Sequence, residues 1–282
     1  MSIARLGIVG SGIMGSGIAE VAAKSGVEVI LRSRQQATAD AMVAGLAKSL
    51  AKQVEKGRLD ETAAKEIEGR VTATDDLQAL ADCDLVIESV VEDLAVKQDL
   101  FRQLDGIVKP EGILATNTST LPIVELATAT ERPDKVVGIH FFNPAPMMKL
   151  VEVIPPLTAS AETVEAAKAF AAACGKDVVE VKDRAGFIVN ALLFPYLNNA
   201  VRMLENGTAS RDDIDTAMKG GCNFPMGPLA LLDLVGLDTS LSILDALYDE
   251  FRDPNYAAVP LLRRMVAAGK LGRKSGSGFY DY

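Results

Sequence analysis

The sequence lacks any run of about 18 uncharged apolar residues, the length that a membrane-spanning helix needs. Its start also lacks the charged-then-apolar order and the cleavage site of a signal peptide. We therefore expect a cytoplasmic protein that has no membrane partner. With 282 residues, of which 49% are hydrophobic, the chain can still build one large domain or two ordinary ones, and we expect two.

Cysteine is scarce, and its spacing excludes two common uses of this residue. The chain has three cysteines, Cys83, Cys174 and Cys222, which lie far apart and form no CxxC pair. An odd number at such distances argues against a disulfide framework and against a zinc site. We expect no metal, and we interpret the three cysteines as small buried apolar residues.

Positive charge is also in deficit. The 29 lysines and arginines face 38 acidic residues, which leaves a net charge of −9. Nucleic acids and anionic membranes need a broad basic surface, so neither is expected as a partner. A small anionic ligand remains compatible with this charge, provided that basic residues gather locally where the ligand binds.

Short β-branched runs alternate with helical patterns from residue 3 to about residue 182. This alternation is typical of βαβ units in a mainly parallel sheet. We expect the first five strands to lie in order through a doubly wound sheet. The expected strands are 5–9, 27–31, 70–73, 84–89, 112–116, 136–141, 150–154 and 177–181.

Two further segments complete the predicted organisation. Residues 35–68 are rich in Ala, Lys, Glu and Leu and are interrupted only near Gly57, which predicts an inserted helical hairpin that covers the ligand. After residue 184 the strand signals nearly vanish. The predicted fold is therefore α/β: a Rossmann-type dinucleotide-binding domain over 1–184 with the inserted hairpin, followed by an all-α domain over 185–282.

A glycine-rich loop follows the first expected strand and opens the first expected helix. It reads Gly10, Ser11, Gly12, Ile13, Met14, Gly15, which is the GxGxxG spacing in its required strand–turn–helix context. In such loops the first glycine permits a tight turn, the second lets the backbone approach a pyrophosphate, and the third allows close packing of helix on strand. The free N–H groups of the helix N-terminus then face the phosphates.

The acid that usually ends the second strand of an NAD-preferring site is missing. Ser33 stands there, with Arg32 and Arg34 on either side. A cationic pocket with a hydroxyl suits a 2′-phosphate, which a carboxylate would repel, so the pattern favours NADP over NAD. The alternative is that the arginines are solvated strand-end charges or stack on adenine without selecting the phosphate.

His140 is the only histidine in the chain. Oxidation of an alcohol needs a base that takes the hydroxyl proton as hydride leaves, and imidazole exchanges protons near neutral pH. A histidine at the end of an apolar strand, taken alone, is more often a hydrogen-bonded structural residue. His140 by itself therefore leaves both interpretations open.

Several motifs that occur in a fixed order are more specific evidence of function than one histidine. Together they resemble the 3-hydroxyacyl-CoA dehydrogenases over nearly the full length, and most closely their short-chain 3-hydroxybutyryl-CoA members. The matching segments are GSGIMGSGIAE, VIESVVED, TNTSTLPI, GIHFFNPAPMMKLVEVI, DRAGFIVNALL, PMGPLALLDLVGLDT and GRKSGSGFYDY. The serine at position 33 departs from the family pattern and puts NAD preference in doubt.

The resemblance implies a reaction and its catalytic residues. It implies interconversion of an (S)-3-hydroxyacyl-CoA and its 3-keto form, with His140 as general acid and base. Glu152 would accept a hydrogen bond from the other ring nitrogen and fix the tautomer. Ser119 and Asn190 would bind the substrate oxygen and thioester region, although read separately they are a turn residue and a helix cap.

The resemblance also implies binding residues. Glu92, Lys97, Asn143, Ser119 and Lys274 would contact the cofactor, the first two near the nicotinamide ribose. For coenzyme A it implies Ser49 and Lys56 in the inserted hairpin, with Lys52 one helical turn earlier, in addition to Ser119 and Asn190. Such lysines are otherwise ordinary on exposed helices.

Two other functions stay open. The first is a dehydrogenase of a free hydroxy acid or sugar acid, and the second is a nucleotide-binding protein without catalysis. The resemblance also implies a homodimer formed through the helical domain, for which residues 191–197 are apolar enough. The residues leave open the preferred acyl-chain length and the direction of the reaction in the cell. They also leave open whether the pathway is β-oxidation, butanoate metabolism or polyester-precursor synthesis.

Overall fold

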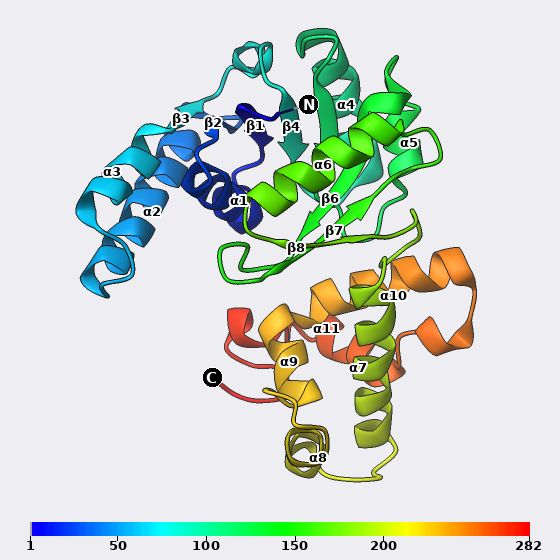
Figure 1. The fold of residues 1–282 in the computed structure, drawn as a ribbon. Coiled ribbons are helices and arrows are strands. Elements are labelled where there is room, and N and C mark those ends of the chain that lie inside the picture. Colours follow the sequence, from blue (N-terminus) through cyan, green and yellow to red (C-terminus); the bar gives the residue numbers. More distant parts are fainter. Residues whose placement is uncertain (1) are drawn as a thin grey trace. The chain divides into compact units, whose positions relative to one another are not determined.

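An eight-stranded sheet forms the centre of the N-terminal part of the chain (Figure 1). In the computed structural model, which describes residues 2–282, the strand order is β3-β2-β1-β4-β5-β6-β7-β8. All eight predicted strands are present, with ends within one residue of prediction. Their bounds are β1 Arg5–Val9, β2 Glu28–Arg32, β3 Val71–Thr74, β4 Leu85–Glu88, β5 Ile113–Thr116, β6 Val136–Phe141, β7 Leu150–Ile154 and β8 Asp177–Glu180.

The expectation that the first five strands lie in chain order is wrong. β4 pairs with β1 and not with β3, so the order reverses on either side of β1. The chain winds outward from β1 in both directions, which places helices on both faces of the sheet. Parallel strands covered on both faces become apolar throughout, and Leu6, Ile8, Leu85 and Ile87 are fully buried. β6 and β7 pair in the antiparallel direction and β8 is parallel to β7, so the last two strands run opposite to the first six.

The predicted insertion is a helical hairpin. α2 spans Gln36–Glu55 and α3 spans Glu61–Gly69, and Gly57 adopts φ +64° between them. Asp60 caps α3 by accepting a hydrogen bond from the Ala63 N–H. The remaining helices of this part are α1 Ile13–Lys24, α4 Leu94–Ile107, α5 Ile123–Ala127, α6 Ala161–Ala173, and the 3₁₀ turns η1 Leu77–Leu80 and η2 Pro133–Lys135.

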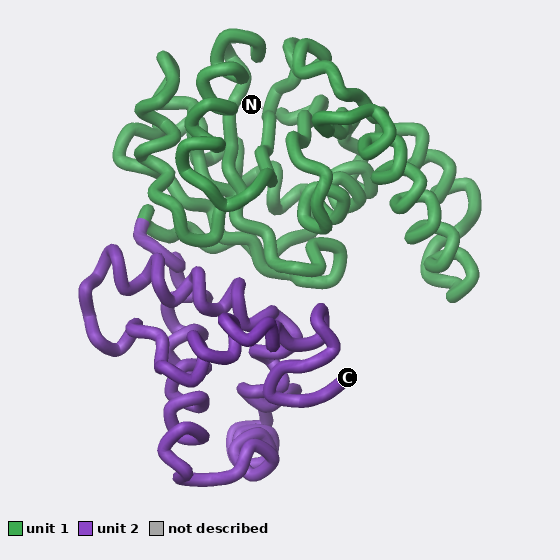
Figure 2. Tube along the Cα trace, turned by 180° about the vertical axis from the view of Figure 1, so that it is seen from behind, with its two compact units in different colours: residues 1–183 green, residues 184–282 purple. Residues whose placement is uncertain are grey.

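The chain divides into two compact units, one ending at Asp183 and one spanning residues 184–282 (Figure 2). The second unit is built from helices around a leucine-rich core that includes Leu197, Leu232 and Leu244. Its elements are α7 Val189–Glu205, α8 Arg211–Cys222, α9 Pro228–Val235, α10 Leu237–Phe251 and α11 Pro260–Ala267, with the short turns η3 Pro254–Tyr256 and η4 Arg273–Ser275.

Two buried aspartates in the second unit hold the C-terminal tail. Asp233 accepts hydrogen bonds from the backbone N–H groups of Phe279 and Tyr280, at 2.9 and 2.8 Å. The Tyr280 hydroxyl donates to Asp215 at 2.9 Å. Burial, followed by this bond and the charge of Asp215, raises the pKa of Tyr280 above its usual range. The tail is therefore part of the packed unit.

The prediction that all three cysteines are buried is wrong for one of them. Cys83 is buried, and burial raises the pKa of its thiol to about 11. Cys174 is half-buried, whereas Cys222 is exposed in the last turn of α8. Only Ile214 and Asp215 of α8 are buried, so its last turn has no core to pack against.

No helix within residues 2–282 is long and apolar enough to cross a membrane. In the same residues, no group of three or more His, Cys, Asp or Glu side chains is arranged to hold a metal ion.

Candidate active site

The glycine loop joins β1 to α1, and its three glycines have different neighbours. Gly10 adopts φ +134°, and a Cβ there would lie 2.3 Å from the carbonyl oxygen of Ser89. A Cβ on Gly15 would lie 2.3 Å from the Gly10 carbonyl oxygen. At Gly12, by contrast, no protein atom lies within 4 Å of that position. Packing within the protein requires the first and third glycines, so the second is left for a ligand.

The start of α1 fits the phosphates of a dinucleotide. Gly12 is the N-cap of this helix, and no side chain caps its N–H groups. α4, in comparison, is capped by Asp93, which accepts from the Val96 N–H. Uncapped N–H groups and the positive end of the helix dipole together favour a bound anion. The residues present therefore fit a pyrophosphate.

This difference among the glycines predicts opposite effects of alanine substitutions. Gly12→Ala should keep the melting temperature of the wild type, because φ −80° suits alanine, but weaken cofactor binding about tenfold by blocking the phosphates. Gly15→Ala should destabilise the protein by about 1–3 kcal/mol, because its Cβ meets backbone. Thermal unfolding and fluorescence titration with cofactor measure both quantities.

Gly106→Ala serves as the control, since its Cβ would also meet nothing within 4 Å and the residue lies outside the loop, in α4. Wild-type cofactor affinity in Gly12→Ala would contradict the assignment of this loop to the phosphates.

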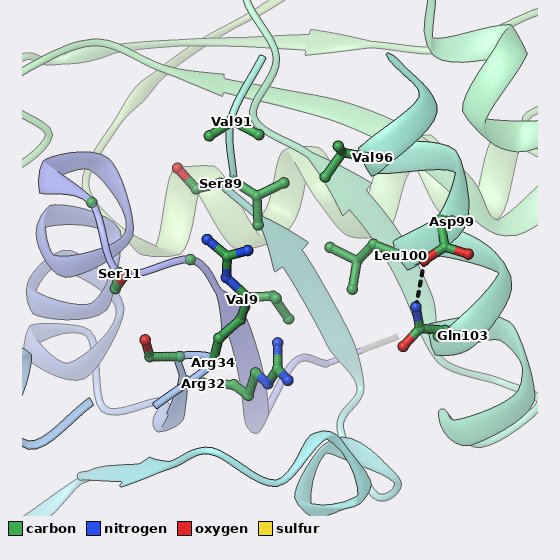
Figure 3. Close-up of a pocket in the computed structure, with 14 residues that line it drawn as sticks. Val9, Ser11, Arg32, Arg34, Ser89, Val91, Val96, Asp99, Leu100 and Gln103 are labelled. Carbon is green, nitrogen blue, oxygen red and sulfur yellow. Dashed lines mark hydrogen bonds between the residues drawn. The ribbon is translucent and has the colours of Figure 1, made fainter. Parts of the chain in front are cut away.

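A cavity of about 620 Å³ opens beside the glycine loop. Figure 3 shows the side chains of Arg32 and Arg34 reaching from the end of β2 toward the space between the loop and α4. Across it lie Leu100 and the hydrogen-bonded pair of Gln103 and Asp99. The lining residues are Val9, Gly10, Ser11, Gly12, Arg32, Ser33, Arg34, Ser89, Val90, Val91, Val96, Asp99, Leu100 and Gln103.

The cavity brings together most of the loop and strand-end residues that the sequence singled out. Ser33 is buried, and its N–H donates to the Thr74 carbonyl at 3.0 Å, while the Arg32 Nε donates to the Asp75 carbonyl at 3.3 Å. Ile13, Met14 and Gly15 do not line the cavity but form the first turn of α1. The sequence did not predict that residues of α4 line this cavity, because α4 reaches the cavity only through the pairing of β4 with β1.

His140 and Glu152 are direct partners across the antiparallel strands β6 and β7. His140 Nδ1 lies 2.8 Å from Glu152 Oε2, and the two residues are 4% and 0% exposed. Side chains directly opposite in an antiparallel pair lie within contact distance, so the register itself creates this pair. The carboxylate accepts from Nδ1, which in the neutral ring leaves Nε2 as the acceptor atom.

Ser119 completes a chain of three side chains. Its Oγ lies 3.1 Å from His140 Nε2, on the ring nitrogen that faces away from Glu152. Asn117 ties the loop that carries Ser119 to β6, because its side-chain oxygen accepts from the Phe141 N–H at 2.8 Å. The ring of Phe142 lies 4.5 Å from the imidazole. Imidazole and hydroxyl are thus held at one edge of the sheet.

Glu92 and Lys97 lie behind this loop and do not line the cavity. Glu92 accepts from the Ser119 N–H at 2.9 Å and from the hydroxyl of Thr118. Lys97 is 1% exposed, and its ammonium lies 2.8 Å from both carboxylate oxygens of Glu88. A direct contact between Lys97 and a cofactor, as the sequence predicts, would require Lys97 to leave Glu88. Glu88 itself was not singled out from the sequence.

The predicted coenzyme A residues lie on α2. The Ser49 hydroxyl donates to the buried Glu20 of α1 at 3.0 Å, and Gln53 donates to the same carboxylate at 2.8 Å. Burial alone would raise the pKa of Glu20, but hydrogen bonds from Lys24, Gln53 and Ser49 lower it below its usual value. Lys52 and Lys56 are exposed.

Three further predicted contact residues, Asn143, Asn190 and Lys274, do not line the cavity. Asn143 is exposed on a loop whose carbonyl groups at Ala145 and Met148 accept from Lys176 at 2.6 and 2.8 Å. In the second unit, Asn190 is buried near the start of α7. Lys274, also in that unit, forms an ion pair with Asp238 at 2.5 Å.

A dinucleotide loop and a group able to transfer a proton sit on the same sheet, which is what hydride transfer to or from an alcohol needs. Fold and site together define a Rossmann-type dehydrogenase. Family models narrow this class: the 3-hydroxyacyl-CoA dehydrogenase NAD-binding domain matches residues 5–184, and the C-terminal domain of the same family matches 186–282. The chain belongs to the 3-hydroxyacyl-CoA dehydrogenase family.

Individual relatives match over the full length. A 3-hydroxybutyryl-CoA dehydrogenase of Clostridioides difficile is 49% identical over 278 residues, which cover 99% of each chain. The crystal structure of FadB2 from M. tuberculosis superimposes with a TM-score of 0.98 at 48% identity, covering 100% of both chains. That of the (S)-3-hydroxybutyryl-CoA dehydrogenase from Ralstonia eutropha has a TM-score of 0.97 at 43% identity, covering 100% of this chain and 99% of the other.

Proposed function

We propose that this enzyme interconverts (S)-3-hydroxybutyryl-CoA and acetoacetyl-CoA, with NADP(H) preferred over NAD(H). The observation that carries the proposal is the chain Glu152–His140–Ser119, with contacts of 2.8 and 3.1 Å. The relatives from C. difficile and R. eutropha, whose names state this substrate, match the whole chain at 49% and 43% identity and support the short acyl group.

Each residue has a defined task in the proposed reaction. When bound, the reduced nicotinamide supplies the hydride that reaches C3 of the keto thioester. His140, protonated on both ring nitrogens, donates its Nε2 proton to the C3 oxygen and is left neutral. Glu152 stabilises the charged ring and holds its orientation. Ser119 donates a hydrogen bond to the same oxygen, and Asn190 binds the thioester region. Oxidation runs through the same groups in reverse.

The proposed cofactor preference rests on the end of β2. Arg32, Ser33 and Arg34 all line the cavity, and no carboxylate stands among them to bind ribose hydroxyls or repel a phosphate. Guanidinium groups form strong charge-assisted bonds with phosphate. The family model describes an NAD-binding domain, so NAD(H) serves as the second cofactor in this proposal.

Each unit has its own binding task in the proposed enzyme. Residues 1–184 bind the dinucleotide, and residues 185–282 bind substrate and form a homodimer. Lys52 and Lys56, exposed on α2, attract the phosphates of coenzyme A, which an acidic protein must bind with local positive charge. The cytoplasmic location predicted from the sequence stays a prediction.

A comparison of thioester and free acid tests the substrate. The enzyme should reduce acetoacetyl-CoA with a kcat/KM at least about a hundredfold above that for acetoacetate, because remote coenzyme A contacts stabilise the transition state. The double variant Lys52→Ala/Lys56→Ala should lose part of this advantage by raising KM for the thioester alone. Equal kcat/KM for acid and thioester would instead favour a free hydroxy acid as substrate.

A further inference from the structure

Glu88 is a buried carboxylate that the proposed reaction does not yet use. It is the last residue of β4 and is fully buried, with Val9 of β1 and Thr116 of β5 as its register partners. Its oxygens accept hydrogen bonds from the Lys97 ammonium at 2.8 Å, from the Val90 N–H at 3.1 Å and from the Thr116 hydroxyl. A buried charge is costly unless it is paired and hydrogen-bonded, and this one is both.

The ammonium of Lys97 connects Glu88 to a second carboxylate. It lies 3.3 Å from Glu92 Oε2, so one buried cation stands between two acidic groups. Lys97 is 1% exposed, whereas the side chain of Glu92 is 40% exposed and leans toward the Ser119 loop. Lys97 therefore fixes the position of a carboxylate that solvent would otherwise release.

Two routes, one through an ion pair and one through hydrogen bonds alone, lead from Glu88 to the loop of Ser119. Through Lys97 and Glu92 the first reaches the Ser119 N–H, at 2.9 Å from the Glu92 carboxylate. The second passes through the Thr116 hydroxyl, which accepts from the Thr118 N–H at 3.1 Å. The first route ends at the backbone of Ser119 and the second at the preceding residue, and the Ser119 hydroxyl lies 3.1 Å from His140 Nε2.

We propose that Glu88 is a positioning residue for the reaction, holding Ser119 against His140 through Lys97 and Thr116. This rests on the proposed function, in which the Ser119 hydroxyl and the imidazole share the substrate oxygen. When Glu88 loses its charge, Lys97 turns to Glu92 as its only carboxylate and draws it away from the loop. Ser119 then moves relative to Nε2, and a misplacement of this kind lowers the rate of the chemical step.

The test compares Glu88→Gln with a matched variant of another ion pair. Asp105, on the same helix as Lys97, binds Arg132 at 2.6 Å with both side chains 13% exposed, and it has no link to the Ser119 loop. Glu88→Gln should lower kcat for acetoacetyl-CoA reduction about 10- to 100-fold, with KM for acetoacetyl-CoA within about threefold of wild type. Asp105→Asn should lower the melting temperature and leave kcat unchanged.

A second readout does not depend on turnover. Because the chain has one histidine, a histidine-labelled sample has a single imidazole whose ¹⁵N signals need no assignment between residues. The Nε2 signal of Glu88→Gln should shift from the wild-type position toward that of Ser119→Ala, while that of Asp105→Asn stays in place. If the wild type reduces no acyl-CoA, the proposed function fails, and this spectrum still tests Glu88.

The double variant Glu88→Gln/Lys97→Gln covers the case in which the single variant does not fold, since it leaves no unpaired buried charge. It should also shift the Nε2 signal and lower kcat, because Glu92 then loses the ammonium that holds it beside the Ser119 loop. A Glu88 variant that keeps wild-type kcat, or a wild-type Nε2 signal, would overturn the proposal and make the buried ion pair a stabilising feature alone.

Discussion

His140→Gln lowers kcat for acetoacetyl-CoA reduction by about a thousandfold, the expected loss when a general acid is removed from a reaction of this kind. Glutamine keeps a polar group near the position of Nε2 but transfers no proton. The cofactor cavity is lined by other residues, so the dissociation constant for the dinucleotide should stay within about threefold of wild type. Steady-state kinetics and fluorescence titration measure the two quantities on the same sample.

His140→Asn supplies the matched control, because its amide lies nearer to the position of Nδ1 and can still bond to Glu152. It should be as inactive as His140→Gln but more stable, since it leaves the buried carboxylate paired. Turnover at the wild-type rate by either variant would remove the proposed acid and base and favour a cofactor-binding protein whose histidine is structural.

Ser33→Asp reverses the cofactor preference. The new carboxylate would stand between Arg32 and Arg34 at the cavity wall, where it repels a 2′-phosphate and can bind the ribose hydroxyls of NADH. Loss of charge-assisted bonds of about 1.5–3 kcal/mol corresponds to a fall of roughly 10- to 100-fold in kcat/KM with NADPH. The kcat/KM with NADH should rise. The ratio of kcat/KM with NADPH to kcat/KM with NADH should therefore change by more than either value alone.

Ser160→Asp is the control for the added charge. Ser160 caps α6, and aspartate is as good an N-cap as serine, so this variant adds the same charge away from the cavity. Its ratio of NADPH to NADH turnover should equal that of the wild type. An unchanged ratio in Ser33→Asp would mean that the arginines face solvent or stack on adenine without reading the phosphate.

The strands and the helical hairpin could be predicted because local signals determine them. β-branched runs such as 136–141 and 150–154 end at turn residues, and the interruption near Gly57 marks the bend between α2 and α3. The strand order was not predictable in the same way. Pairing of β4 with β1 arises from the crossover after β3, which no local pattern encodes.

The site shows the same division between local and tertiary signals. His140 could be found because it is the only histidine, and its pairing with Glu152 was implied by family resemblance before the β6–β7 register placed the two opposite each other. The buried ion pair of Glu88 and Lys97 could not be predicted, because a glutamate at a strand end and a lysine on a helix are usually exposed. Only packing of α4 on the sheet buries the pair.

The most direct test of the central claim is the initial rate of acetoacetyl-CoA reduction by the wild-type protein, measured with NADPH and with NADH at matched concentrations and low salt. Turnover with both cofactors, faster with NADPH, is the predicted result. Faster turnover with NADH would still support the proposed substrate and the roles of His140 and Glu152. It would contradict the preference for NADP(H) that is assigned to Arg32, Ser33 and Arg34. No rate with either cofactor would contradict the proposed reaction.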